Sequence, residues 1–304
     1  MKNKPPFPPF LGLAIGVCAV STASTFIRLA QGEVHPLAIA VWRLGIGGSV
    51  FCAAAVFSKK SSRRVLTAQE RLFITASGIL LAVHFSTWII SLSLTSVTAS
   101  VVIVTLYPVF TALGSRLFFR EPLTCGVWIG IWTAFFGSAV ISVSDIRTGG
   151  HRFSGDLLAL AGAVSVAGYF LIGKQMRKRV GLVTYAAYTY STAAAVSAAA
   201  ALLFRIPLAG YSTSAWLWIL LIALIPQITG HTFLNWSLKY MSATAVTLPV
   251  LTEPLISVLL AWAVLKEPPP AEAAAGAVCV LAGMYIALSR VNKKRLGISV
   301  LPDK

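Results

Sequence analysis

Two halves of the chain repeat each other at a constant spacing. The stretch TLYPVFTALGSRLFFREP over residues 105–122 returns, altered, as LTEPLISVLLAWAVLKEP over residues 251–268. The offset is 146 residues, the difference between positions 108 and 254. So many coincidences at one offset predict a tandem duplication. Further pairs at this offset are Ser91 and Ser237, Leu92 and Leu238, Ser96 and Ser242, Thr98 and Thr244, Ala99 and Ala245, Glu121 and Glu267, Pro122 and Pro268, Gly130 and Gly276, and Gly137 and Gly283.

Long apolar windows occupy most of the chain. Of the 304 residues, 57% are hydrophobic and only 11% are charged, against about 25% charged in soluble domains. Each window is long enough to cross a bilayer as a helix, for which about 20 residues are needed. The sequence therefore predicts an all-α membrane protein with ten transmembrane helices. The windows cover about residues 9–29, 36–57, 72–93, 97–119, 124–144, 155–174, 183–204, 214–237, 243–265 and 271–290.

Basic residues predict the orientation. With the N-terminus placed in the cytoplasm, 19 of the 25 Lys and Arg residues fall on the cytoplasmic side, 5 fall on the other side, and Arg43 lies within a window. The positive-inside rule then predicts a multi-pass protein of the plasma membrane with both termini cytoplasmic. Topology and anionic lipids at the cytoplasmic face account for the net charge of +16, so we expect no nucleic-acid partner.

The duplication and the topology together predict an inverted repeat. Five windows fall in residues 9–144 and five in residues 155–290, and a basic cytoplasmic tail follows at 291–304. Because five is odd, the second copy enters the membrane in the opposite sense to the first. The prediction is two inverted five-helix repeats, an architecture that supports alternating access to a site near the midplane.

Four short motifs stand out, and two of them, LYPV with REP and TEPL with KEP, stand at matching places in the two halves. They are PLAIAVWR over residues 36–43, LYPV over 106–109 with REP at 120–122, SGDLL over 154–158, and TEPL over 252–255 with KEP at 266–268. On these motifs the chain resembles the drug/metabolite transporter superfamily, specifically ten-span proteins with two EamA domains. The resemblance implies a plasma-membrane carrier of small organic metabolites, often an exporter, with a cavity lined by helices 1, 3, 4, 6, 8 and 9. One departure is Arg43. At the offset of 144 residues that matches Phe26 with Phe170, Ala187 stands in its place in helix 7.

Glu253 is the one acidic residue of nine that lies well inside a window. A carboxyl at this depth must be paired, hydrated or protonated, since a bare charge there is costly. One hypothesis makes Glu253 a proton-coupling group or a site for a substrate amine. The other makes it a structural carboxyl that is hydrogen-bonded near the break expected at Pro254.

Two polar stripes lie at corresponding places in the repeats. His84 and Trp88 share one helix face with Ser91, and Gln227, His231 and Asn235 share another. They should face the bundle interior, where they either line a cavity or bond one helix to another. The predicted substrate-binding residues are His84, Trp88, Tyr107, Tyr169, Gln227, His231 and Asn235. No third ligand accompanies the two histidines, so no metal is expected.

Prolines interrupt the fourth and ninth windows. Pro108 and Pro254 each remove a backbone hydrogen bond, so we predict kinks there that either act as gates or stay fixed. Arg43 either pairs with a carboxylate or carbonyl, extends to the interface, or holds a substrate anion. Of these three possibilities we favour structural pairing.

These observations favour a secondary transporter that exports small organic metabolites, amino-acid-like or otherwise amphipathic, by alternating access. An uncoupled facilitator is the alternative. A membrane-embedded enzyme is a remote one, because no catalytic motif is present, so no enzymatic activity or cofactor is expected. The expected partners are a small-molecule substrate and the lipid bilayer, and the protein is expected to be a monomer or a homodimer. The substrate, the direction of transport and any coupling ion stay open.

Overall fold

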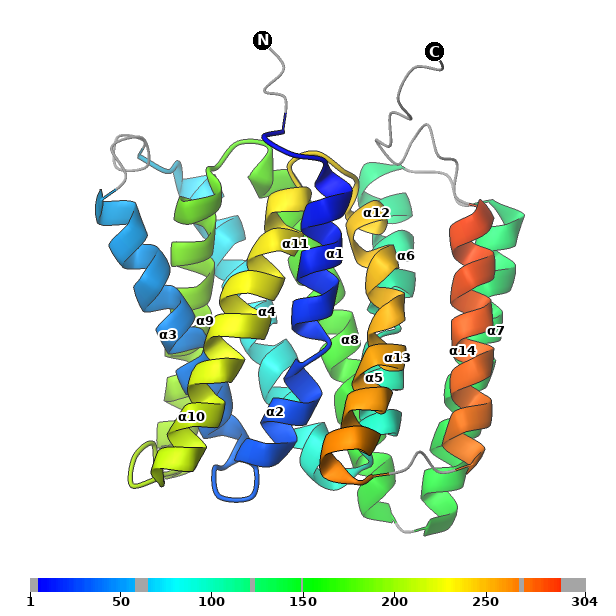
Figure 1. Ribbon diagram of the computed structural model, residues 1–304. Helices are drawn as coiled ribbons and strands as arrows, with labels where there is room; N and C mark the ends of the chain where they lie inside the picture. Colours follow the sequence, from blue (N-terminus) through cyan, green and yellow to red (C-terminus); the bar gives the residue numbers. More distant parts are fainter. Residues whose placement is uncertain (1–4, 58–64, 121–123, 149, 268–270, 291–304) are drawn as a thin grey trace.

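The computed structural model describes residues 5–57, 65–120, 124–148, 150–267 and 271–290. These residues form helices and, within those ranges, no strand (Figure 1). The elements are α1 Pro9–Val20, α2 Ala23–Ala30, α3 Pro36–Phe57, α4 Ala68–Leu94, α5 Val97–Val104, α6 Tyr107–Phe119, α7 Cys125–Thr148, α8 Gly150–Arg177, α9 Leu182–Leu203, α10 Thr213–Ile222, η1 Ala223–His231, α11 Thr232–Ser237, α12 Ala243–Thr247, η2 Leu248–Thr252, α13 Glu253–Leu260, η3 Ala261–Leu265 and α14 Ala271–Arg290.

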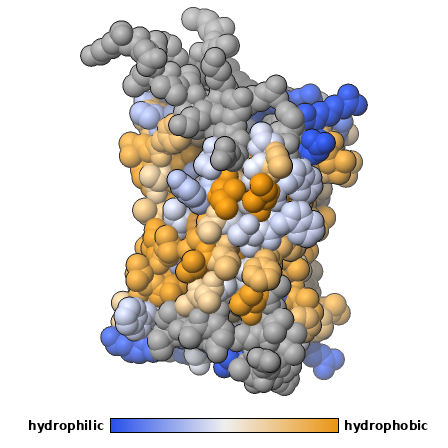
Figure 2. Space-filling model, turned by 90° about the vertical axis from the view of Figure 1, so that its right-hand side faces the viewer, coloured by the Kyte–Doolittle hydropathy of each residue, from blue (hydrophilic) through white to orange (hydrophobic). Residues whose placement is uncertain are grey.

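The elements join into ten crossings that match the ten predicted windows. The first crossing is α1–α2, the fourth is α5–α6, the eighth is α10–η1–α11, and the ninth runs from α12 to η3. Eight crossings are long and apolar enough to span a membrane, and α7 and α14 carry shorter apolar stretches, Cys125–Gly137 and Ala274–Ala287. Apolar side chains form a band across the middle of the face in Figure 2, with hydrophilic ones toward its ends. The chain is a multi-pass integral membrane protein.

The two ends of the bundle differ in charge. The chain enters α1 and leaves α14 at the same end, which is the upper one in Figure 1. We call it the basic end, and the other the far end. The predicted tail at 291–304 and three of the paired motif residues, Glu121, Pro122 and Pro268, lie outside the described residues. At the basic end stand Arg71, Arg116, Arg177, Lys178 and Lys239.

Paired glycines show how the two repeats are related. α7 and α14 lie side by side at one edge of the bundle (Figure 1). A Cβ on Gly130 would lie 2.3 Å from the carbonyl oxygen of Gly283, and a Cβ on Gly137 would lie 2.6 Å from that of Gly276. A shift by the repeat offset converts one contact into the other, because Gly130 corresponds to Gly276 and Gly137 to Gly283. Gly137 follows Gly130 along α7, whereas its partner Gly276 precedes Gly283 along α14, so the two helices run in opposite directions. The helices are therefore antiparallel mates about a two-fold axis perpendicular to them, as an inverted repeat requires.

A pair of cations obeys the same symmetry. The Arg28 guanidinium donates to the Leu92 carbonyl, and Lys174 Nζ donates to the Leu238 carbonyl at 3.0 Å. Arg28 and Lys174 are separated by the repeat offset of 146 residues, and so are Leu92 and Leu238. Each cation thus covers carbonyl groups left open at the end of the third crossing of its repeat, as a helix C-terminus requires.

Four crossings are interrupted, and two of these interruptions, in the first and eighth crossings, were not predicted. The first window was expected to be one helix over 9–29, yet α1 ends at Val20 and α2 begins at Ala23. The Ser21 hydroxyl donates to the Val17 carbonyl and the Thr22 hydroxyl to the Ala19 carbonyl, both at 2.8 Å. Such bonds compete with the helical ladder and bend it. Ser257 of the ninth crossing donates to the freed Ser21 carbonyl at 2.9 Å.

The other interruptions follow the prolines. α5 ends at Val104, just before Pro108, and the ninth crossing tightens into the 3₁₀ turn η2 before Pro254. Pro108 and Pro254 stand in the first turns of α6 and α13, where a missing N–H costs little. The eighth crossing widens into the π-helix η1 around Pro226, which the sequence analysis did not anticipate.

The third crossing begins four residues earlier than the predicted position 72. Thr67 starts α4 with a capping box: its hydroxyl accepts from the Glu70 N–H at 3.2 Å, and the Glu70 carboxylate accepts from the Thr67 N–H at 3.1 Å. This reciprocal pair satisfies two open donors at the helix start. Hydropathy alone misses it, because the capping residues are polar.

Candidate functional site

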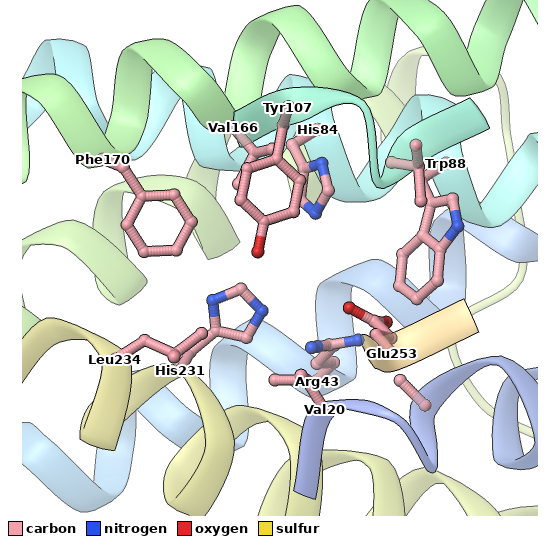
Figure 3. A pocket seen from close by; sticks show the side chains of 12 residues that line it. Val20, Arg43, His84, Trp88, Tyr107, Val166, Phe170, His231, Leu234 and Glu253 are labelled. Carbon is pink, nitrogen blue, oxygen red and sulfur yellow. The ribbon is translucent and has the colours of Figure 1, made fainter. Parts of the chain in front are cut away.

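The interrupted helices meet around a central cavity (Figure 3). Val20 stands at the break of the first crossing, Val104 at the end of α5, Glu253 at the start of α13 and His231 at the end of η1. Backbone irregularity inside a membrane is tolerated where it lines a cavity or meets protein. The cavity is lined by Val20, Ala23, Arg43, His84, Trp88, Val104, Tyr107, Val166, Phe170, His231, Leu234 and Glu253.

Arg43 is the most constrained side chain of the site. It is 1% exposed, and its Nε donates to Gln227 Oε1 at 2.8 Å. The guanidinium carbon lies 3.8 Å from the centre of the Phe85 ring, which holds it by a cation–π contact. Its Nη1 has no hydrogen-bond partner. One side of the guanidinium is thus fixed by the protein, and the other keeps an open donor in the cavity wall.

Glu253 provides the opposite charge. It is buried at the first position of α13, where a carboxylate also benefits from the helix dipole. Its carboxyl group points toward the Arg43 guanidinium (Figure 3), and the two groups interact electrostatically. Arg43 is therefore paired with Gln227 and Phe85, and it interacts electrostatically with Glu253 beside it in the cavity wall.

Two histidines complete the polar wall. His84 Nδ1 lies 2.9 Å from the Gly162 carbonyl, so this nitrogen carries the proton. The His84 ring stacks on Trp88 with centroids 5.8 Å apart. His231 packs edge-on against Phe85 at 5.1 Å, and its Nδ1 has no partner. In the described part of the chain, no three His, Cys, Asp or Glu side chains are grouped to hold a metal ion.

The structure divides the predicted substrate-binding residues into two sets. His84, Trp88, Tyr107 and His231 line the cavity, and so does Glu253. Three others stand behind its wall. Gln227 holds Arg43, and the Asn235 amide donates to the hydroxyls of Tyr169 and Tyr190. The second set joins the eighth crossing to α3, α8 and α9 and does not line the cavity.

Several cavity residues were not predicted. Phe170 lies four residues after Val166, so the two share a face of α8, and Leu234 lies three residues after His231. Apolar residues at helical spacing are ordinary in a membrane helix, so the sequence holds no signal that singles them out. Arg43 had been expected to be structural, and it is both held by the protein and part of the cavity wall.

The cavity is small. Its volume is about 30 Å³, which is room for about one water molecule. Sites for organic ligands usually measure about 300–1,000 Å³. The cavity as it stands is therefore too small to hold an organic molecule unless the surrounding helices move apart.

Comparisons with known proteins find one matching family and several relatives of similar length. The model of the EamA-like transporter family matches residues 8–143 and 153–289. The uncharacterized transporter YdfC of Bacillus subtilis is 25% identical over 292 residues, which is 92% of this chain and 90% of that protein. The uncharacterized transporter YyaM of the same organism is 24% identical, covering 88% and 90%.

A third relative and a solved structure also match most of the chain. An uncharacterized transporter of Archaeoglobus fulgidus is 26% identical over 91% of this chain and 98% of its own length. A solved structure titled only as the crystal structure of a protein superposes with a TM-score of 0.69 at 21% identity, covering 93% of this chain and 99% of that one. At that identity the likeness concerns the fold alone.

Proposed function

Because the chain belongs to the EamA-like transporter family, we propose that it is a secondary transporter for small amino-acid-like solutes that works by alternating access. The observation that carries the proposal is the placement of Arg43 and Glu253 on one buried cavity (Figure 3). A charge this deep in a membrane protein is costly and usually marks a substrate or ion pathway.

A zwitterion suits both charges. Its carboxylate would accept from the open Nη1 of Arg43, since guanidinium groups bind carboxylates strongly. Its ammonium group would bind the Glu253 carboxylate. The aromatic rings of Trp88, Tyr107 and Phe170 in the same wall would pack against an apolar side chain.

Two features support alternating access. The repeats are antiparallel mates, so exchanging their conformations exposes the site to the other side. The small volume of the cavity is what we would expect of a closed intermediate between two open states. By the positive-inside rule we place the basic end in the cytoplasm of a plasma-membrane protein, and we propose export as its physiological direction.

Transport in proteoliposomes tests the substrate class. Uptake of a labelled neutral amino acid is competed by the unlabelled amino acid, by an amine without the carboxyl group, and by a carboxylate without the amine. Both single-charge analogues should compete at least tenfold more weakly, because hydrogen bonds to charged groups contribute about 1.5–3 kcal/mol. Arg43→Gln should abolish discrimination against the amine, and Glu253→Gln discrimination against the carboxylate.

Folded variants that keep the wild-type discrimination would overturn the assignment. Gln175→Glu, an exposed change on α8, serves as the control for handling and reconstitution. An imposed pH gradient separates two mechanisms. Accumulation that follows the gradient and disappears in Glu253→Gln indicates proton coupling through this residue. Equilibration without accumulation indicates an uncoupled facilitator, the alternative function, in which Glu253 serves only binding or structure.

A further inference from the structure

A second hollow lies at the basic end, away from the central cavity. It is formed by the turn between α8 and α9 and by the end of α11, and its volume is about 310 Å³. Four of its nine lining residues are cations, and none is an acid: Arg177, Lys178, Arg179 and Lys239. A hollow with this charge attracts an anion with several acceptor oxygens.

The floor of this basic hollow is rigid. Arg177 is only 3% exposed, its Nε donates to the Asn235 carbonyl at 3.1 Å, and it also donates to the Val180 carbonyl. Lys178 and Lys239 stand at its exposed rim. A buried guanidinium below two exposed ammonium groups provides positive charge at several depths, which favours a group that enters the hollow over one that touches the surface.

The start of α9 adds to the positive electrostatic potential in the basic hollow. Gly181 precedes this 22-residue helix, lines the hollow, and offers no side chain to cap its first N–H groups. Helix N-termini bind anions through these donors and through the helix dipole. The helix start therefore reinforces the cations around the hollow.

Aromatic rings set the depth of the hollow in the membrane. Trp236 and Tyr240 line it with centroids 4.9 Å apart, and Lys239 Nζ lies 5.6 Å from the Tyr240 ring centre. Tryptophan and tyrosine gather where the hydrocarbon meets the headgroups. Basic pockets between helices at this level suit phospholipid headgroups. We propose that the basic hollow binds the phosphate group of an anionic phospholipid.

The test is a titration of the detergent-purified full chain with short-chain phosphatidylglycerol, followed by thermal stability. Ligands that bind the native state raise the melting temperature, so the titration yields an apparent Kd. Lys178→Gln combined with Lys239→Gln removes two exposed charges. The Kd should rise roughly 30-fold, since each basic residue near anionic lipid contributes about 1 kcal/mol, or about fivefold.

The matched control is Arg71→Gln combined with Arg116→Gln, which removes the same charge from exposed positions at the same end. It should leave the Kd within about twofold. Equal losses in both double variants, or equal stabilisation by phosphatidylcholine, would show diffuse attraction and overturn the site. Inorganic phosphate presents the same chemistry without acyl chains. If phosphate alone stabilises the protein and competes with the lipid, the phosphate site stands but its assignment to a lipid is overturned.

Discussion

Arg43 is held by the protein on one side of its guanidinium and open on the other. Gln227 accepts from Nε, Phe85 lies under the plane, and Nη1 keeps an unmatched donor. An unmatched buried donor costs about 1–3 kcal/mol, and more on a charged group. A substrate carboxylate would remove that cost, so the open Nη1 favours the binding of a group with acceptor oxygens.

The first prediction follows from that holding contact. Gln227→Glu places a carboxylate against Arg43 Nε, so the guanidinium is neutralised within the protein. The variant should fold, because the new carboxylate is paired with Arg43. Its KM for a zwitterionic substrate should rise at least about tenfold, because the substrate carboxylate loses its charged partner. An unchanged KM in the reconstituted variant, with Gln175→Glu as the surface control, would contradict this role.

A second prediction concerns a carboxylate outside the membrane-spanning segments. Glu33 accepts from the Ser212 hydroxyl at 2.6 Å and from the Ser212 N–H at 2.5 Å, which joins the α2–α3 turn to the start of α10. The side-chain bond first and the backbone bond second lower the pKa of Glu33 below its ordinary value of 4.5. The bonds therefore stabilise the folded state above pH 4.5, and this contribution is lost as pH falls through the lowered pKa.

Thermal unfolding of wild type and Glu33→Gln across pH checks this sign. The wild type should unfold at the higher temperature near neutral pH, and the two curves should converge in acid. A difference that grows toward acid pH would mean that the protonated form is the stabilising one. Because Glu33 is fully exposed to solvent, added salt should shrink the neutral-pH difference.

At the scale of elements, the contact between α7 and α14 depends on having no side chain. Gly130→Ala would bring a Cβ to 2.3 Å from the Gly283 carbonyl oxygen and 2.6 Å from the Ala287 nitrogen. The helices would have to separate, and such overpacking costs about 1–3 kcal/mol. We expect a lower melting temperature in detergent. Gly45→Ala is the control, because a Cβ there meets no atom within 4 Å.

The control, Gly45→Ala, should not lower the melting temperature. Alanine is favoured over glycine in a helix by up to about 1 kcal/mol, so Gly45→Ala should be neutral or stabilising. Gly130→Ala and Gly283→Ala remove room at the same contact, so their combined effect should be smaller than the sum. Additive effects, or a destabilising Gly45→Ala, would show that the packing between the repeat mates is looser than the structure has it.

The elements also show which structural features can be predicted from the sequence. Hydropathy and the repeat offset predict the ten crossings, because each crossing must bury its own backbone groups and therefore stays helical. The break at Ser21 escapes such reasoning. Its cause is hydroxyl groups that bond to Val17 and Ala19 carbonyls, and the same residue types also occur in unbroken helices. The support from Ser257 depends on a contact between residues 236 positions apart.

The sequence predicts which residues belong to the site better than it predicts how they contact one another. Helical spacing placed His84 and Trp88 on one face, and depth marked Glu253, so most of the polar cavity wall could be chosen from the sequence. That Gln227 holds Arg43 could not, since nothing in a single sequence pairs residues 184 positions apart. The same limit hides Asn235, whose amide meets two tyrosines instead of the cavity.

At the scale of the molecule, a set of bonds around Glu267 joins four crossings at the far end. Glu267 Oε1 accepts from the Val97 N–H at 2.9 Å, and its Oε2 lies 3.7 Å from Arg28 Nε. Arg28 in turn donates to the Leu92 carbonyl. These bonds hold the ends of the first, third, fourth and ninth crossings together. In an alternating-access cycle, such a set must open before the central cavity communicates with the far side.

The last prediction is that Glu267→Gln shifts the protein toward a state open at the far end. The change removes the charge that faces Arg28 and weakens the bond to Val97. A partly exposed pair of this kind contributes about 1 kcal/mol, which changes the ratio of two states about fivefold. A cysteine at Val20, in the cavity wall, reports the change when the four native cysteines are replaced.

A membrane-impermeant thiol reagent applied from the far side should label that cysteine about fivefold faster in Glu267→Gln. Glu33→Gln is the matched control, because it removes a carboxylate at the same end that binds the start of α10 instead. Equal acceleration in both variants would mean general loosening, and no acceleration in either would mean that other contacts close the far end. Acceleration in Glu267→Gln alone, lost again when substrate is added, would link this contact to the closed cavity, because a bound substrate draws the population back to the state that encloses it.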